Sequence, residues 1–171
     1  MPTKKRTLPR KPRARLSHVD EQGDVRMVDV GRKPATHREA VARGTIAITP
    51  DALELIRARK IAKGDPLQTA RLAGIMAAKR TSELIPLCHS LPLSSVDVAL
   101  RPRRDGYEIE ATARTTAQTG VEMEALTAVA AAGLTIYDMV KAVDKTMVIG
   151  DIRLIRKTGG RSGTYRRRDR S

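Results

Sequence analysis

An acidic and a basic residue three positions apart, Asp138 and Lys141, are the most direct candidates for chemistry in this chain. Both fall near the end of a predicted helix, and side chains three apart on a helix project to the same side. An ammonium group beside a carboxylate keeps the carboxylate ionised and able to accept a proton, so the pair could act in proton transfer. The same spacing is typical of an ordinary surface ion pair, which the spacing alone somewhat favours.

A thiol and an imidazole are adjacent at Cys88 and His89, in a loop after a predicted helix that Pro86 ends. A Cys-His nucleophile is not expected, because successive side chains of an extended chain point apart. A zinc site is not expected either, since the three histidines are scattered and the chain has one cysteine. We expect Cys88 to be buried and inert, with His89 exposed as a hydrogen-bond donor or proton carrier.

Two basic segments that contain glycine could bind an anion. Lys63-Gly64-Asp65 precedes a predicted helix N-terminus, where backbone amides and a lysine could hold phosphate together; alternatively it is a helix stop, with Asp65 capping the next helix. The segment 157–163, Lys-Thr-Gly-Gly-Arg-Ser-Gly, follows the last predicted strand and could wrap an anion with amides and cations. It lacks the spacing of a phosphate-binding P-loop, and no helix follows it.

Three further charged residues have structural interpretations. Glu122 stands three residues after Thr119, the spacing of a capping box at the start of a helix, and Glu124 faces elsewhere around that helix. Arg38 is followed by Glu39 in the first long strand, and such pairs of opposite charge usually face solvent.

The elements that position these residues follow from hydrophobic periodicity and from helix start and stop signals. They are a strand over 36–48, a helix from Thr49-Pro50 to a stop at Gly64, a helix over 67–84, strands over 95–100 and 107–113, a helix from the Thr119 cap to about residue 143, and a strand over 147–155. A face of small residues around Gly74 in the second helix predicts tight packing. This order predicts an α+β, ferredoxin-like fold, an antiparallel sheet with helices packed on one face.

Length and composition predict one folded domain over residues 25–163, with basic flexible tails at 1–24 and 164–171. The chain has 171 residues, 40% of them hydrophobic, and neither Phe nor Trp, so a base-stacking RNA-binding sheet is not expected. The net charge of +14 is concentrated at the two ends, each with seven Lys or Arg within residues 1–15 and 156–171. One cysteine and no signal-like apolar run near the start predict a cytoplasmic protein. The uncharged stretch 125–137 is too short to span a membrane.

Two other functional classes remain open from the residues alone. A nucleic-acid or ribosome-associated binding protein could use the basic ends, including Arg166-Arg167-Arg168, but the nearly neutral middle of the chain argues against it. A purely structural assembly subunit would leave Asp138, Lys141 and Lys63 without a joint purpose.

Seven segments of the sequence resemble a known family, the cyclic pyranopterin monophosphate synthases, or MoaC family, of molybdenum-cofactor biosynthesis. They are Met27-Val28-Asp29-Val30, Lys63-Gly64-Asp65, Ala77 to Thr81, Leu84 to His89, Gly120 to Leu126, Tyr137-Asp138-Met139 with Lys141, and Lys157 to Gly163. The resemblance covers roughly residues 25–163. These motifs are long enough to be specific.

The resemblance implies a lyase that converts (8S)-3′,8-cyclo-7,8-dihydroguanosine 5′-triphosphate to cyclic pyranopterin monophosphate and diphosphate. It implies no cofactor and no metal site, no membrane and no specific nucleic acid as partners, and a homohexamer, a trimer of dimers, with active sites at subunit interfaces. By motif position, Asp138 matches the catalytic acid or base, and Lys141 and Lys63 match essential lysines. The implied substrate-binding residues are Leu87, Cys88, His89, Met123, Glu124, Glu122, Arg38 and Lys157, the last two near the phosphates.

The sequence departs from the family pattern at two of these motifs. Ser90 follows His89 where the family commonly has proline, and Val140 replaces a residue that is often cysteine. Neither departure removes an implied catalytic group, but loss of the proline allows the His89 loop more backbone freedom.

Overall fold

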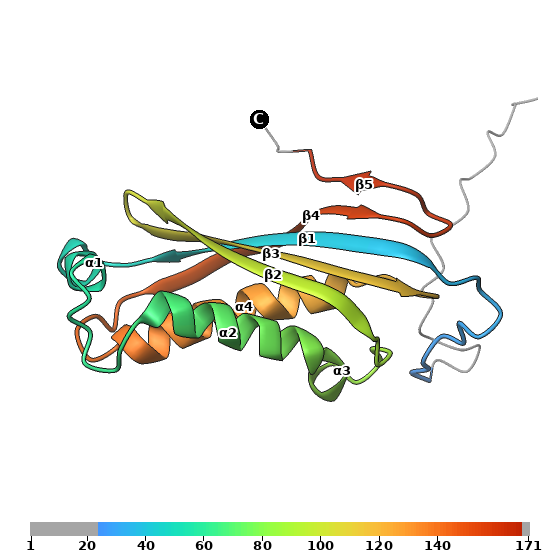
Figure 1. Ribbon diagram of the computed structural model, residues 1–171, viewed down its shortest axis with the longest axis horizontal. Helices are drawn as coiled ribbons and strands as arrows, with labels where there is room; N and C mark the ends of the chain where they lie inside the picture. Colours follow the sequence, from blue (N-terminus) through green and yellow to red (C-terminus); the bar gives the residue numbers. More distant parts are fainter. Residues whose placement is uncertain (1–23, 169–171) are drawn as a thin grey trace, which may run out of the picture.

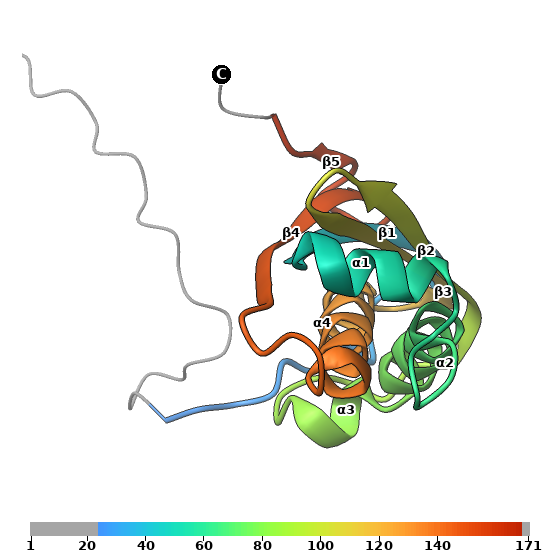
Figure 2. The ribbon, with the colours of Figure 1, turned by 90° about the vertical axis from the view of Figure 1, so that its left-hand side faces the viewer.

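A five-stranded antiparallel sheet forms one layer of the structure, and two long helices cover one of its faces (Figure 1). The computed structural model describes residues 24–168. In chain order the elements are β1 (Thr36–Ala47), α1 (Pro50–Arg57), α2 (Pro66–Lys79), α3 (Thr81–Leu84), β2 (Leu93–Arg103), β3 (Gly106–Ala117), α4 (Glu122–Val140), β4 (Val148–Thr158) and β5 (Tyr165–Arg166). Seen end-on, α2 and α4 lie side by side beneath the sheet, and α1 lies across one end of it (Figure 2).

The strand order is β2-β3-β1-β4-β5, and every neighbouring pair is antiparallel. β3 therefore lies between β1 and β2, the two strands that α2 connects, as a split β-α-β arrangement requires. The predicted α+β class is confirmed, with an antiparallel sheet and the long helices on one face. The order of the first four strands agrees with the ferredoxin-like arrangement, to which α1 and β5 are additions.

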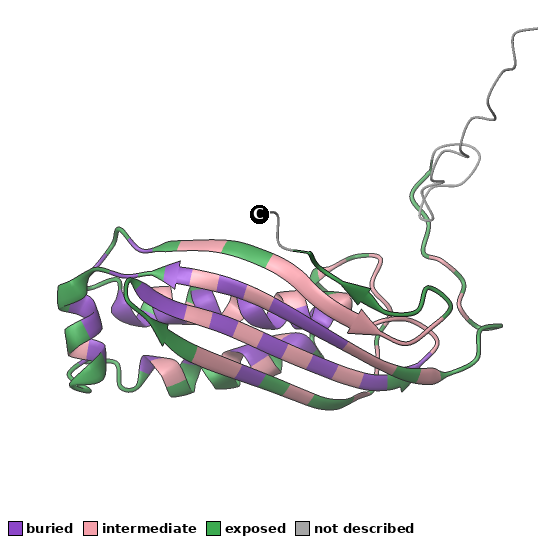
Figure 3. Cartoon of the chain, turned by 90° about the horizontal axis from the view of Figure 1, so that it is seen from above, coloured by how far each residue is buried: buried purple, intermediate pink, exposed green. Residues whose placement is uncertain are grey.

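Alternation along the central strands separates a helix-covered face from an open face. Ala40, Ala42 and Ile46 of β1 are buried beneath the helices, whereas Arg43 lies on the opposite face. The buried and half-buried residues alternate visibly along β1 and β3 in Figure 3. As the composition predicts, the core consists mainly of Ala, Val and Ile, and Tyr107 is its only buried aromatic residue within residues 24–168.

Small residues let α2 pack directly against α4 and let β1 pack against α4. A Cβ atom at Gly74 would lie 2.9 Å from the carbonyl oxygen of Ala128, so no larger residue fits there without movement. At Gly44 a Cβ atom would lie 2.7 Å from a methyl carbon of Val129. The tight packing predicted for the small-residue face around Gly74 is confirmed.

The first helix ends earlier than its sequence predicts, at Arg57 rather than at Gly64. The backbone N–H of Lys60 donates to the carbonyl of Leu55, and Arg59 has a φ of 55°, which together form a Schellman motif. This left-handed position usually holds glycine. Because arginine stands there, the sequence carries no stop signal.

The second helix is interrupted where the sequence predicts one helix over residues 67–84. α2 ends at Lys79, and a separate turn, α3, begins at Thr81. The buried Thr81 hydroxyl donates to the carbonyl oxygens of Ala78 and Ala77, at 3.0 and 3.3 Å. A threonine that bonds to the preceding turn competes with the regular helical pattern, which accounts for the break.

The capping box predicted for the long helix is wrong. α4 starts at Glu122 with Val121 as its N-cap and without a side-chain cap, so Thr119 lies outside the helix. The helix also ends at Val140, not at about residue 143. Glu122 occupies the first helical position instead of the third, so its carboxylate cannot make the reciprocal bond of a capping box. It is free to contact a group outside the helix.

The C-terminal segment predicted as a flexible tail, residues 164–171, includes the short strand β5. Tyr165 pairs with Lys157 and Arg166 with Arg156, and the N–H of Arg167 donates to the carbonyl of Ile155 at 2.8 Å. The open edge of β4 supplies these backbone partners. The basic composition of the segment, on which the prediction of a tail rested, does not indicate this pairing. The predicted N-terminal tail, residues 1–24, lies outside the described residues except for its last residue.

Candidate active site

Two adjoining cavities lie at the N-terminal end of α4. They have volumes of about 630 and 740 Å³ and share four lining residues, Lys33, Thr119, Gly120 and Glu122. The first cavity is bounded by the Cys88-His89 loop and the start of α4, and the second by the 157–163 segment and the start of β1. Residues far apart in sequence thus line two neighbouring cavities, each of a size suited to a small-molecule ligand.

The first cavity gathers most of the implied substrate-binding residues. Leu87, Cys88, His89, Met123 and Glu124 all line it. His89 is half-buried rather than exposed, because its Nε2–H donates to the carbonyl oxygen of Val28 at 3.0 Å. This bond ties the segment that precedes β1 to the loop after α3, so His89 positions one wall of the cavity.

Two acidic groups in this cavity have pKa values raised above the ordinary ones. Glu124 is 4% exposed, and burial, with a smaller contribution from the nearby Glu122 charge, raises the pKa of its carboxyl. Burial, followed by the Glu124 charge, also raises the pKa of the Cys88 thiol. Cys88 is half-buried, not fully buried as predicted, but its raised pKa agrees with the prediction that it is not a reactive thiolate.

The second cavity brings Arg38 and Lys157 together at the end of the sheet. Arg38 does not face solvent as the sequence interpretation held. It lies on the helix side of β1, where its guanidinium donates to the carbonyl oxygens of Ala117 and Gln118 at 3.3 and 3.2 Å. The neighbouring Glu39 points to the opposite face, because successive side chains of a strand alternate.

The glycines of the 157–163 segment allow it to fold over Arg38. Gly159 and Gly160 have φ values of 91° and 73°, and a Cβ atom at Gly160 would overlap the Arg38 guanidinium. Lys157 Nζ donates to the Ser162 hydroxyl at 2.5 Å and lies 3.5 Å from the Glu122 carboxylate. Three cations of this cavity, Arg32, Lys33 and Arg161, have no hydrogen bond or ion pair from their side chains within the described part of the chain.

A second cluster, at the other end of α4, contains the residues implied to be catalytic. The Asp138 carboxylate forms ion pairs with two ammonium groups, Lys63 Nζ at 2.8 Å and Lys141 Nζ at 2.7 Å. Lys63 also donates to the Asp138 carbonyl oxygen at 3.0 Å. Hydrogen bonds and charge from Lys141 and then Lys63 lower the pKa of Asp138 to about 2. The carboxylate is therefore ionised at neutral pH, although all three side chains are about half exposed.

Of the two interpretations of the segment around Gly64, the structure confirms the cap at Asp65, whereas α1 stops before Gly64 and phosphate binding by this segment stays a prediction. Asp65 is the N-cap of α2, and its carboxylate accepts hydrogen bonds from the N–H groups of Leu67 and Gln68. Lys63 instead reaches across to α4 and makes the three-residue cluster with Asp138 and Lys141. The ion pair of Asp138 with Lys141 is thus part of a larger arrangement that spacing within one helix could not show.

The two groups of residues do not meet within one protomer. Asp138 follows Met123 by fifteen residues in the same helix, which at 1.5 Å per residue separates them by about 22 Å. Lys63, Asp138 and Lys141, which the resemblance implies are catalytic, form a cluster at one end of α4, called the catalytic cluster below. The cavities with His89, Glu124, Arg38 and Lys157 lie at the other end. A single chain therefore holds the two groups of implied site residues, called half-sites below, at opposite ends of α4.

The segment before β1 supplies residues that the sequence analysis assigned no role. Val28, Val30 and Lys33 line the first cavity, and Arg32 and Lys33 line the second. A tight turn holds this segment, with the N–H of Gly31 donating to the Asp29 carboxylate at 2.8 Å. Residues 27–30 belong to a motif quoted for the family resemblance. That motif is the sequence signal from which a role for this segment could have been predicted.

Comparison with known proteins decides the family. A model of the MoaC family matches residues 27–160. The chain belongs to the MoaC family. This confirms the resemblance seen in its motifs, and proteins named cyclic pyranopterin monophosphate synthase match nearly the whole chain.

Three MoaC relatives illustrate the similarity. The protein from Thermomicrobium roseum is 61% identical over 158 residues, which cover 91% of this chain and 95% of that relative. The protein from Chloroflexus aggregans is 62% identical, with 90% of this chain and 94% of the relative covered. The protein from Streptomyces griseus is 58% identical, with 90% and 86% covered.

Two further observations concern the site and its central helix. Within residues 24–168, no group of three or more His, Cys, Asp or Glu side chains could hold a metal ion. By length and composition α4 could cross a membrane, contrary to the estimate from its uncharged stretch, but half of it is buried in this fold. A central helix that packs against a sheet and against α2 has the same apolar character.

Proposed function

We propose that two copies of this MoaC-family chain combine their half-sites to convert (8S)-3′,8-cyclo-7,8-dihydroguanosine 5′-triphosphate to cyclic pyranopterin monophosphate and diphosphate. Family membership and the shared name of its relatives assign the chain the activity of a cyclic pyranopterin monophosphate synthase, a lyase of molybdenum-cofactor biosynthesis. The observation that carries the composite site is the separation of the catalytic cluster from the cavities by the length of α4.

A two-fold axis across the middle of α4 would bring the half-sites together. If Asp138 of one copy is level with Met123 of the other, the axis passes between Ala130 and Ala131. Both are half-buried alanines, so two antiparallel α4 helices could approach closely there. Each such pair of copies would contain two equivalent sites.

Exposed apolar side chains on the helix layer support this pairing. Leu134 of α4 and Leu72 of α2 are each 62% exposed, and Met76 of α2 is 55% exposed. Helices that expose large apolar side chains commonly bury them against a partner. Three such pairs would make the homohexamer that the family resemblance implies.

The cavities would hold the triphosphate end of the substrate. Arg38 and Lys157, with the unpaired cations Lys33 and Arg161, give the second cavity an excess of positive charge over Glu122. Guanidinium and ammonium groups neutralise phosphate oxygens and would stabilise the charge that develops as diphosphate leaves. The guanine-derived ring would then occupy the first cavity, against Leu87 and Met123.

The catalytic cluster and Glu124 would handle protons. In the free protomer Asp138 is ionised, and it becomes a stronger base when substrate phosphates attract Lys141 and Lys63 away from it. Glu124, with its raised pKa, can carry a proton into the same enclosed space. Asp138 and Glu124 therefore divide the roles of base and acid during ring opening and pterin closure. The single cysteine is consistent with a reducing, cytoplasmic setting for this reaction.

The test is to incubate the purified protein with the cyclised triphosphate and to measure both cyclic pyranopterin monophosphate and diphosphate. Asp138→Asn and Lys141→Ala should each lower turnover by about a hundredfold or more. Asp105→Asn and Lys145→Ala are matched controls, because both residues are exposed and lie outside the cavities and the catalytic cluster. Near-normal turnover in Asp138→Asn would contradict the assignment of the base.

A further inference from the structure

An arginine cluster lies on the open face of the sheet, away from both half-sites. Arg166 of β5 stands directly opposite Arg156 of β4, so their side chains share one face. Like charges placed directly opposite in a sheet are destabilising. Within residues 24–168, the side chains of Arg166 and Arg167 make no hydrogen bond or ion pair.

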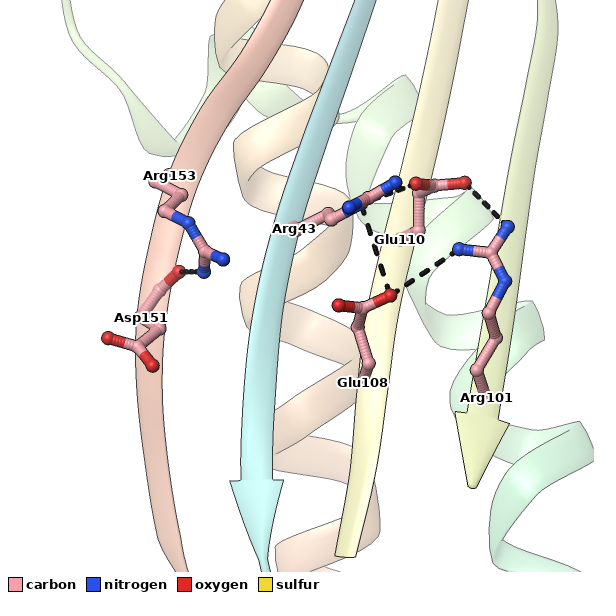
Figure 4. Close-up of polar contacts among 6 residues, drawn as sticks. All are labelled: Arg43, Arg101, Glu108, Glu110, Asp151 and Arg153. Atoms are coloured by element: carbon pink, nitrogen blue, oxygen red, sulfur yellow. Dashed lines mark hydrogen bonds and ion pairs between the residues drawn. The ribbon is translucent and has the colours of Figure 1, made fainter. Parts of the chain in front are cut away.

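Two acidic residues of this face, Glu110 and Glu39, are already bound by other arginines. Glu110 accepts from Arg43 at 2.6 Å and from Arg101 at 2.9 Å, as Figure 4 shows. Glu39 is bound by Arg114 at 2.6 Å and by Arg156 at 2.7 Å. These short ion pairs leave neither Glu39 nor Glu110 free to neutralise Arg166 and Arg167. Asp97 faces the same side, but it belongs to β2, at the edge of the sheet opposite β5.

The unpaired arginines border a cavity of about 420 Å³. Arg43 and Arg156 line it with Arg166 and Arg167, and Glu110 is its only acidic lining residue among the described residues. Val41, 7% exposed, and Thr112 belong to the strands beneath it. In Figure 1, β5 stands above β4 and β1, on the side of the sheet opposite the helices. The arginines therefore surround one hollow instead of following a line across the surface.

We propose that this cavity is a second anion site, which binds a small ligand carrying a diphosphate group. Guanidinium groups bind phosphate oxygens through paired N–H donors, and several arginines around one volume favour a ligand with more than one negative charge. Binding would place negative charge between Arg156 and Arg166 and relieve their repulsion. An extended nucleic acid would favour a continuous basic track, whereas these side chains converge. The proposal does not depend on the composite active site.

Titration calorimetry with inorganic diphosphate tests the site in the full-length protein. An Arg38→Ala, Lys157→Ala background weakens phosphate binding in the active-site cavities, and the part of the remaining binding that depends on Arg166 and Arg167 reports the sheet face. Adding Arg166→Ser and Arg167→Ser should weaken that binding at least about tenfold, since two charge-assisted contacts are lost. Adding Arg103→Ser, a residue at the far end of β2, should leave the affinity unchanged. The same titration with a guanosine diphosphate shows whether the site takes a free or a nucleoside-linked diphosphate.

Hydrogen exchange of the unaltered protein provides a second measurement. Diphosphate should slow exchange of the Arg167 amide, whose N–H donates to the carbonyl of Ile155. The proposal is wrong if diphosphate neither protects that amide nor binds more weakly to the arginine variant. It is also wrong if the variant keeps its diphosphate affinity and loses only affinity for a single-stranded oligonucleotide. In an otherwise unaltered chain, Arg166→Ser with Arg167→Ser should leave lyase turnover normal.

Discussion

Mixing two inactive variants tests whether each active site is shared between two copies of the chain. Under the proposed function, Asp138→Asn should disable the catalytic cluster, and Lys157→Ala should disable the cavity proposed to bind phosphate at the other end of α4. These positions are separated by most of the length of the helix, about 22 Å between Met123 and Asp138. No movement of side chains spans that distance, so the proposed site requires a second copy to bring the two groups together.

The expected recovery follows from how mixed pairs form. Random assortment of equal amounts makes about half of all pairs mixed. Each mixed pair contains one site with both changes and one intact site. The turnover should therefore return to about a quarter of that of the unaltered enzyme. Each variant alone should retain about a hundredth of the activity or less. The assay is formation of cyclic pyranopterin monophosphate after the two variants are unfolded and refolded together.

Two matched mixtures control for nonspecific effects. Asp138→Asn mixed with Lys141→Ala alters the same half-site in both chains, and so does Lys157→Ala mixed with Arg38→Ala. Neither mixture can form an intact site, and neither should recover activity. If Asp138→Asn with Lys157→Ala recovers no more than these controls, although light scattering shows that mixed oligomers have formed, the composite site is refuted.

Three further predictions concern stability and the cavities. Gly160→Ala should weaken substrate binding and lower stability by about 1–3 kcal/mol, measured by KM and urea unfolding, because its φ is 73° and a Cβ atom would displace the Arg38 guanidinium. Gly74→Ala should cost about 1–3 kcal/mol in the same unfolding assay, because its Cβ atom would lie 2.9 Å from the Ala128 carbonyl oxygen; an unchanged midpoint would show that α2 and α4 can separate. Glu124→Gln should leave the free energy of unfolding unchanged near pH 4 and raise it near pH 8. Burial raises the pKa of Glu124 above its ordinary 4.5. The stability that the buried neutral carboxyl allows is therefore present at low pH and lost as the pH rises through the raised pKa.

Much of the fold was predictable because its signals are local. Alternation along β2 and β3 marks the hairpin, proline after Thr49 and Asp65 marks two helix starts, and small residues around Gly74 mark the close packing of α2 on α4. The errors fall where a residue acts against its usual preference. Arg59 adopts the left-handed conformation that ends α1, and Thr81 bonds backward to divide α2 from α3.

The sequence by itself determined the family and the fold class and predicted the residue types of the site, because long motifs and backbone periodicity are properties of neighbouring residues. Only the tertiary structure showed that Arg38 faces inward beneath the 157–163 segment, that Lys63 reaches Asp138, and that β5 joins the sheet. It also showed that the implied site residues divide between the two ends of α4. Such contacts join residues far apart in the chain, and their geometry depends on how whole elements pack, which no local pattern encodes.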